Sequence, residues 1–169
     1  MGKKSIMRTI AVATVALTVA VLGWGHVAYA AGDAKAEITE FEHKCIAATN
    51  VDEAMSCMDK NDIVLYDFSP PRKYAGAKAV RADLENFFNN AKDAKGDFVE
   101  LEVVTDGKLG VARSIQHFTW KDKEGKPMEA TFRVTDALHK VKGQWKIFHS
   151  HVSVPVDPAT GKGDMQSKT

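Results

Sequence analysis

The C-terminal half of the chain is divided into extended segments by three turns, each of which contains a glycine. Residues 98–156 are rich in β-branched and aromatic residues, which favour strands. The interruptions are Asp106-Gly107-Lys108, Lys123-Glu124-Gly125 and Lys142-Gly143. Short turns of this composition join antiparallel neighbours, so the pattern predicts four long strands in an antiparallel meander. Any fold of the chain has to accommodate this sheet.

Three amphipathic segments precede the predicted sheet. Residues 36–48, 51–58 and 77–91 carry apolar side chains at helical intervals. Residues 63–68 form a short predicted strand that ends at Ser69-Pro70-Pro71. Helices followed by strands indicate the α+β class, with three N-terminal helices packed on one face of a curved antiparallel sheet. Such a sheet can curve into a cone around a pocket.

The first 30 residues have the layout of a secretory signal peptide. Lys3, Lys4 and Arg8 precede an apolar run that ends in Ala28-Tyr29-Ala30. We expect cleavage before Ala31 and a periplasmic or secreted protein. The alternative is an uncleaved anchor, because residues 9–32 contain no Asp, Glu, Lys or Arg.

The rest of the chain is nearly neutral and has the size of one domain. Residues 31–169 contain 20 basic and 22 acidic side chains, with the two signs interspersed. In the absence of a basic stripe, we expect neither nucleic acid nor, after cleavage, a membrane as a partner. The sequence predicts one domain over residues 31–157 and a flexible tail over residues 158–169, which is rich in small and polar residues.

Export affects the expected oxidation state of the chain's two cysteines, Cys45 and Cys57. Thiols in an oxidising compartment tend to pair, and these two lie in consecutive predicted helices joined at Thr49-Asn50. We predict a structural disulfide. The alternative is a pair of buried thiols that pack as small apolar side chains.

Alternation along the predicted strands separates a polar face from an apolar one. A three-residue loop over residues 141–143 would place Thr135 opposite His149, whereas a two-residue loop would place Asp136 there, and both registers stay open. The equivalent turn at residues 123–125 places His117 opposite Thr131. The polar face gathers His117, Thr131, Arg133, Thr135, His149, His151 and Ser153. The apolar face carries Phe118, Trp120, Phe132, Val134, Phe148, Val152 and Val154.

The polar face holds the densest group of side chains that could carry chemistry. His149 and His151 point the same way, but a zinc site needs a third ligand, and only His117 is near. Ser153 is not part of a Gly-x-Ser-x-Gly motif. We therefore expect no metal and no cofactor. The alternative to a functional site is a polar layer in which His, Arg and Thr side chains satisfy one another.

Asp67 is a second candidate, placed between Tyr66 and Phe68 just before the Pro-Pro bend. Apolar neighbours raise the pKa of a carboxyl group, which suits it to accept a proton near neutral pH. The structural alternative is that Asp67 caps the bend through backbone groups of Ser69 or Arg72.

Five segments in order form a specific combination of motifs. They are Tyr66-Asp67-Phe68-Ser69-Pro70-Pro71, Tyr74-Ala75-Gly76, Arg133-Val134-Thr135, Gly143-Gln144-Trp145-Lys146-Ile147 and His149-Ser150-His151-Val152-Ser153-Val154-Pro155. Together they resemble the SnoaL-like branch of the nuclear-transport-factor-two-like superfamily over residues 36–157. Ser150 departs from the Glu that many cytosolic members carry between the two histidines. The resemblance implies a cone-shaped α+β barrel, a pocket between the helices and the concave sheet, and a homodimer formed through the sheet.

Ketosteroid isomerases, a catalytic branch of the same superfamily, place a general-base Asp at the position of Asp67. They also need a Tyr on the first helix and a protonated Asp on the third long strand to stabilise the oxyanion. Those two positions fall near Lys44 or Cys45 and on Thr135, while Asp136 points to the other face. The resemblance therefore does not predict steroid isomerisation.

Two classes of function remain. The first is non-catalytic binding of a small, partly apolar ligand that carries a carbonyl or a carboxylate. Its predicted site consists of Tyr66, His117, Arg133, Thr135, His151 and Ser153. The second is an isomerase- or lyase-type enzyme in which Asp67 or His149 moves a proton. We favour binding because no complete catalytic set is present, and we expect a homodimer because both sheet faces look too apolar for water.

Overall fold

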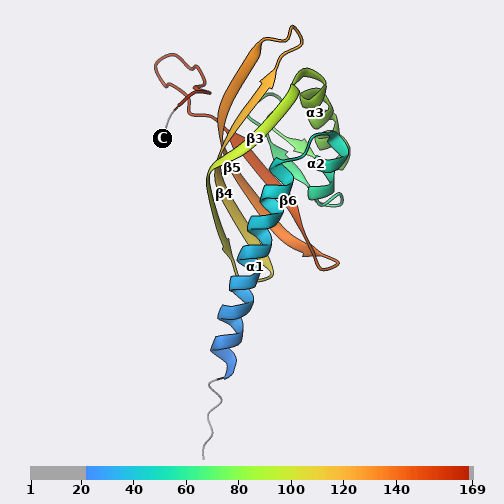
Figure 1. Ribbon diagram of the computed structural model, residues 1–169, viewed down its shortest axis with the longest axis vertical. Helices are drawn as coiled ribbons and strands as arrows, with labels where there is room; N and C mark the ends of the chain where they lie inside the picture. The colour runs from blue at the N-terminus through green and yellow to red at the C-terminus, as the bar shows by residue number, and fades with distance from the viewer. Residues whose placement is uncertain (1–21, 168–169) are drawn as a thin grey trace, which may run out of the picture.

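A computed structural model of the chain describes residues 22–167, with side chains from Asp33 to Ser167. It has the predicted α+β plan (Figure 1). The helices are α1 (Leu22–Ile46), α2 (Val51–Cys57) and α3 (Ala77–Asn90). The strands are β1 (Val64–Tyr66), β2 (Tyr74–Ala75), β3 (Lys92–Thr105), β4 (Leu109–Lys121), β5 (Pro127–Val141) and β6 (Gln144–Ser153). The sequence does not predict β2, because two residues are too few to show a period.

The strands form one curved sheet in the order β2-β1-β6-β5-β4-β3. The four long strands are antiparallel neighbours, as predicted. The short strand β1 adds to the edge of β6 in the parallel direction. The predicted pair His117–Thr131 is confirmed between β4 and β5.

The turn between β5 and β6 has two residues, Lys142 and Gly143, because Val141 pairs with Gln144. Lys142 and Gly143 have φ values of 51° and 81°. Two consecutive left-handed residues define a type I′ turn, which suits the twist of a hairpin. The three-residue loop over residues 141–143 is therefore wrong.

A bulge at Phe148 then shifts the register of β6 by one position. Beyond the bulge, Thr135 pairs with His151, so both predicted partners of His149 are wrong. Phe148 also leaves the apolar face, and its ring stacks on that of His139 with centroids 4.8 Å apart. Compared with the register predicted from the three-residue loop, Thr135 pairs two positions further along β6. A shift of two preserves the face of a side chain, so the polar residues still share one face, as predicted.

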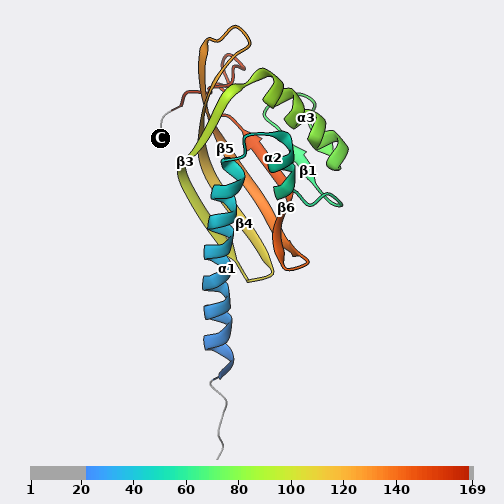
Figure 2. The ribbon, with the colours of Figure 1, turned by 45° about the vertical axis from the view of Figure 1, so that its right-hand side comes forward.

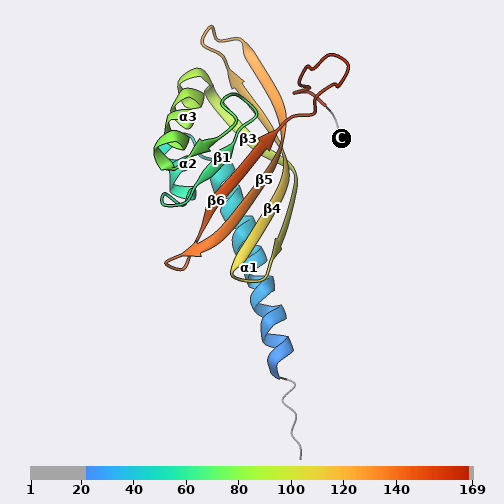
Figure 3. The ribbon, with the colours of Figure 1, turned by 180° about the vertical axis from the view of Figure 1, so that it is seen from behind.

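All three helices lie on one face of the sheet, which we call the inner face. Helix α1 packs along β3 and β4, whereas α2 and α3 contact one another near β6 and β2 (Figure 2). Seen from behind, β4, β5 and β6 are uncovered (Figure 3). We call this uncovered side the outer face.

Helix α1 approaches β4 closely at Gly110. A Cβ atom at Gly110 would lie 2.5 Å from Cδ1 of Ile38, which is fully buried. A side chain larger than hydrogen would therefore force the buried Ile38 side chain to shift. The core around this contact consists of side chains from both layers. Its most buried members include Ile38, Met55, Cys57, Ile63, Val80 and Leu138.

Cys45 and Cys57 form the predicted disulfide, with Cα atoms 6.0 Å apart. The bond joins the end of α1 to the end of α2. Asn50 caps the first turn of α2, where its side chain accepts a hydrogen bond from the Glu53 backbone nitrogen at 3.0 Å. Cap and cross-link together hold the two helices in a tight hairpin.

The predicted signal peptide and tail lie at the two ends of the chain. Residues 1–21 lie outside the described part, and the predicted cleavage bond before Ala31 lies inside α1. None of the helices described from residue 22 onward is long and apolar enough to cross a membrane. In the tail, Val156 bridges Gly163, and the Thr131 backbone nitrogen donates to the Met165 carbonyl at 2.7 Å. The mobility of the tail stays a prediction.

Candidate functional site

A cavity of about 390 Å³ lies between the inner face and the helices. The volume falls in the range of small-molecule sites, about 300–1,000 Å³. All three helices and the strands β1, β3, β4, β5 and β6 contribute to the wall, which is mostly apolar. Its apolar members include Leu84, Phe87, Phe118, Phe132, Val134 and Val152. The predicted apolar face therefore encloses the cavity.

Two buried carboxyl groups, Glu42 of α1 and Asp136 of β5, interrupt this apolar wall. Their residues are 2% and 5% exposed. Glu42 Oε1 and Asp136 Oδ1 have no hydrogen-bond partner among the described residues, although the Ser150 hydroxyl donates to Asp136. We call Glu42 and Asp136 the carboxyl pair. Buried polar atoms are rarely left unpaired, so these two oxygens need an explanation.

Burial changes the protonation of the carboxyl pair. It raises the pKa of Glu42 to about 9, and the nearby charge of Asp136 adds to the rise. It raises the pKa of Asp136 to about 6, against the hydrogen bond from Ser150, which lowers it. Both pKa values are raised, which favours retention of a proton by the carboxyl pair near neutral pH.

Two further carboxyl groups, Asp67 and Asp83, line the cavity. Both residues are half-buried. Asp67 Oδ2 accepts hydrogen bonds from Ser69, at 2.5 Å from Oγ and 3.3 Å from the backbone nitrogen. Asp67 thus caps the bend, as its structural alternative predicts, and also faces the cavity. Burial raises the pKa of Asp83, and the nearby Tyr74 hydroxyl, which donates to the Pro70 carbonyl at 2.9 Å, opposes this rise.

The described wall of the cavity contains no Lys, Arg or His side chain. Its four carboxyl groups are therefore not balanced by any cation on the wall. The favourable environment for an anion that we expected from the polar face is absent here. The electrostatics of the cavity instead disfavour a bound carboxylate.

The predicted ligand-binding residues gather on the outer face, opposite the cavity. Arg133 Nη2 donates to the Val154 carbonyl at 2.9 Å. His149 Nδ1 donates to the Val64 carbonyl at 2.9 Å, and the Tyr66 ring packs edge-on against His149 with centroids 4.8 Å apart. The same face carries His117, Thr135, His151 and Ser153. Of the predicted site residues, Asp67 alone lines the cavity.

The sequence-based reasoning missed Glu42 and Asp136, although both carry a signal. Asp136 follows Phe132 and Val134 at alternate positions, so it belongs to the apolar face. Glu42 lies four residues after Ile38, on the buried stripe of α1. A charged residue on an apolar stripe marks a candidate site. As predicted, Asp136 points to the face opposite Thr135, and this face lines the cavity.

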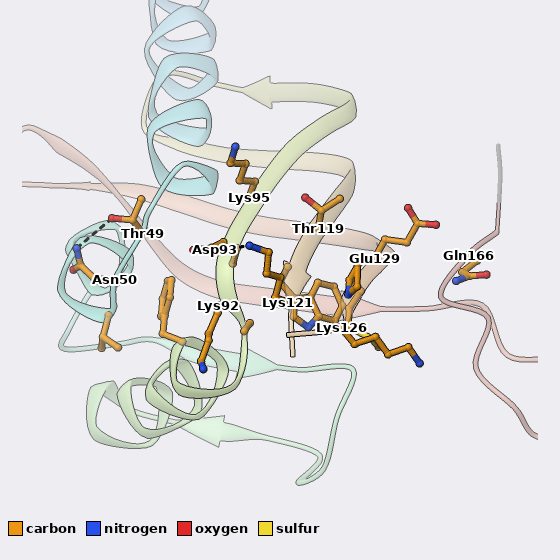
Figure 4. Close-up of a pocket in the computed structure, with 17 residues that line it drawn as sticks. Thr49, Asn50, Lys92, Asp93, Lys95, Thr119, Lys121, Lys126, Glu129 and Gln166 are labelled. Atoms are coloured by element: carbon orange, nitrogen blue, oxygen red, sulfur yellow. Dashed lines mark hydrogen bonds and ion pairs between the residues drawn. The ribbon is translucent and has the colours of Figure 1, made fainter. Parts of the chain in front are cut away.

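A second, shallower depression lies at the surface beside the start of β3 (Figure 4). Four lysines line it, and Lys121 Nζ pairs with Asp93 Oδ2 at 2.7 Å. These side chains are mostly exposed, so solvent screens their charges. The lysines are Lys92, Lys95, Lys121 and Lys126.

Comparisons with solved structures support the fold. An NTF2-like protein of unknown function from Pseudomonas putida KT2440 is 21% identical with a TM-score of 0.72, over 82% of this chain and 98% of that one. A nuclear transport factor 2-like superfamily protein from Salmonella enterica serovar Typhimurium LT2 is 18% identical with a TM-score of 0.67, over 79% and 99%. A protein from Parabacteroides distasonis, provisionally described as a ketosteroid isomerase, is 21% identical with a TM-score of 0.58, over 72% and 87%.

No curated protein matches the chain significantly. The family model of the SnoaL-like domain matches residues 35–157. This match contains the described helices and strands from Lys35 onward, including the carboxyl pair. The chain therefore belongs to the SnoaL-like family of the nuclear-transport-factor-two-like superfamily.

Proposed function

We propose that the chain binds a small, partly apolar molecule in the inner-face cavity without transforming it. The observation that carries the proposal is an apolar cavity of ligand size with two unpartnered, buried carboxyl oxygens in its wall. Apolar walls favour an apolar ligand body, and a polar group of the ligand can satisfy the free oxygens.

The charges of the wall limit which polar groups the ligand can carry. A carboxylate ligand, one of the two expected classes, would meet only carboxyl groups and is not supported. A carbonyl is compatible with the cavity only where a protonated carboxyl donates to it, as Glu42 can. The outer-face residue Arg133 is too far around the sheet to take part, since it faces away from the cavity.

Filling the cavity is expected to abolish binding. We choose Val134→Phe, because Val134 is buried in the cavity wall, and Thr135→Phe as the matched control on the adjacent, outward-facing position. The extra ring of Val134→Phe occupies ligand space, at a stability cost of about 1–3 kcal/mol. Probes are benzylamine, benzyl alcohol, acetophenone and benzoate, measured by thermal shift and calorimetry.

Wild type and Thr135→Phe should bind at least one probe of this set, and Val134→Phe should bind none. Loss of binding in Thr135→Phe but not in Val134→Phe would locate the site on the outer face. Circular dichroism melting of each variant confirms that it is folded.

An enzyme is the second candidate function, and the position of Asp67 favours it. Asp67 lines the same cavity as the carboxyl pair, so a base and a protonated acid face one space. With a carbonyl substrate, Asp67 could accept a proton from carbon while Glu42 donates to the oxygen. His149 lies on the outer face and has no place in this scheme.

The variant Asp67→Asn distinguishes binding from catalysis. If the protein only binds, affinity for a bound probe changes little, because Asn keeps the shape and can still accept from Ser69. If it is an enzyme, proton exchange at the methyl group of acetophenone in D₂O, followed by NMR, should fall by about 100-fold or more. Measurable exchange in wild type that Asp67→Asn abolishes would contradict the binding-only proposal.

We also propose that the protein is exported and dimeric. The disulfide and the leader-like sequence of residues 1–30 support export. A mature N-terminus other than Ala31 in mass spectrometry of exported protein would contradict the predicted cleavage.

For the dimer, the uncovered outer face supplies the surface, and Phe148→Glu at its bulge is expected to give monomers. Light scattering that shows a monomeric wild type would contradict this.

A further inference from the structure

The charges around the carboxyl pair point to the chemical class of the ligand. Four carboxyl groups line the cavity, from α1, the segment after β1, α3 and β5, and no Lys, Arg or His is among its described lining residues. The four are Glu42, Asp67, Asp83 and Asp136. The hydroxyl of Tyr74 is the other titratable group in contact with them, through Asp83. A buried negative charge without a positive partner destabilises the empty protein.

We propose that the cavity selects an organic cation: a small molecule with a protonated amine on an apolar body, whose ammonium group contacts the free oxygens of Glu42 and Asp136. This inference rests on the proposed binding function and names its ligand class. It accounts for both unpartnered oxygens and for the missing counter-charge with one group.

Hydrogen-bond chemistry favours an ammonium over neutral alternatives. Within the described part of the chain, Glu42 Oε1 and Asp136 Oδ1 both lack a donor, and an ammonium brings up to three N–H donors. Bonds between an ammonium and a carboxylate are charge-assisted and stronger than neutral ones. A ketone brings acceptors only, so it would leave the ionised Asp136 without a new partner.

A metal ion fits the cavity less well than an organic cation. Among residues 33–167, no three His, Cys, Asp or Glu side chains are grouped closely enough to hold a metal. Most of the wall beyond the four carboxyl groups consists of aromatic and aliphatic side chains, which suit the hydrocarbon part of an amine. Phe118, Phe132 and Val134 are examples on the inner face.

The test compares benzylamine with benzyl alcohol, acetophenone and benzoate by calorimetry on the full mature chain. Benzylamine is expected to bind at least about tenfold more tightly than the alcohol, a difference of about 1.4 kcal/mol. Its affinity should rise from about pH 6 to about pH 8, because the ammonium binds the ionised carboxyl pair. The apparent enthalpy should depend on the buffer, since binding releases a proton.

The double variant Glu42→Gln/Asp136→Asn should lose the preference for benzylamine and keep any binding of benzyl alcohol. The matched control is Glu40→Gln, an exposed position on the same helix, which should retain the preference. Tighter binding of the alcohol or the ketone, or affinity for benzylamine that falls with pH, overturns the inference and leaves the proposed function standing. Binding of none of the four probes overturns both.

Discussion

Replacing Glu42 with Gln is expected to flatten the pH dependence of the free energy of unfolding. The pKa of Glu42 is raised by burial to about 9 in the folded protein, against an ordinary value of 4.5 in the unfolded chain. Between these values the folded state binds a proton that the unfolded state has released. Stability is therefore full at low pH and falls as pH rises, by at most about 1.4 kcal/mol per pH unit for one group.

Urea unfolding from about pH 5 to about pH 8 measures this slope. Wild type should lose stability over the range, and Glu42→Gln should lose clearly less, since Gln has no proton to release. Glu40→Gln is the matched control, because Glu40 is exposed on α1 and should leave the slope as in wild type. The same slope in Glu42→Gln and wild type would show that Glu42 is ionised in the folded state.

Removal of the disulfide is expected to produce the second large effect. Cys45 and Cys57 are 12 positions apart, and closing a loop of this length stabilises by about 3 kcal/mol on the chain-entropy model. The double variant Cys45→Ala/Cys57→Ala should lose this amount in urea unfolding. Because the cross-link joins α1 to α2 beside the cavity, the variant should also bind probes more weakly.

Reduced wild type is the control for side-chain packing, since it keeps both sulfur atoms without the bond. A similar loss in reduced wild type and in the double variant assigns the effect to the cross-link. A loss below about 1 kcal/mol in both would contradict the account, as would two free thiols on alkylation of the denatured, unreduced protein.

Much of the fold follows from local sequence patterns. The pairing of His117 with Thr131 was predictable because the turn at residues 123–125 sets the register without a bulge. The pairing of Thr135 was not, because the bulge at Phe148 leaves no mark in the alternation of nearby residues. The helices were predictable from their period, whereas the contact of Gly110 with Ile38 depends on tertiary packing.

The candidate site was harder to predict than the fold. Alternation shows which side chains share a face, but the choice of face depends on where the helices pack. We predicted the site on the polar face because His149 and Arg133 lie there, and this face is the outer one. The hydrophobic effect instead packs the helices on the apolar face, so the cavity forms on that side. Asp67 was predicted from its place between Tyr66 and Phe68 before the Pro-Pro bend and from the resemblance to ketosteroid isomerases. Glu42 and Asp136 were missed because each stands alone among apolar neighbours.

We propose the inner-face cavity, and not the polar outer face, as the binding site. Methyl-detected NMR of the labelled mature protein, titrated with benzylamine and separately with benzyl alcohol, tests it most directly. We expect shifts for inner-face methyl groups and none for outer-face ones. The inner set is Leu84, Val134, Ile147 and Val152, and the outer set is Val111, Thr131 and Thr135. Shifts confined to Thr131 and Thr135 would contradict it.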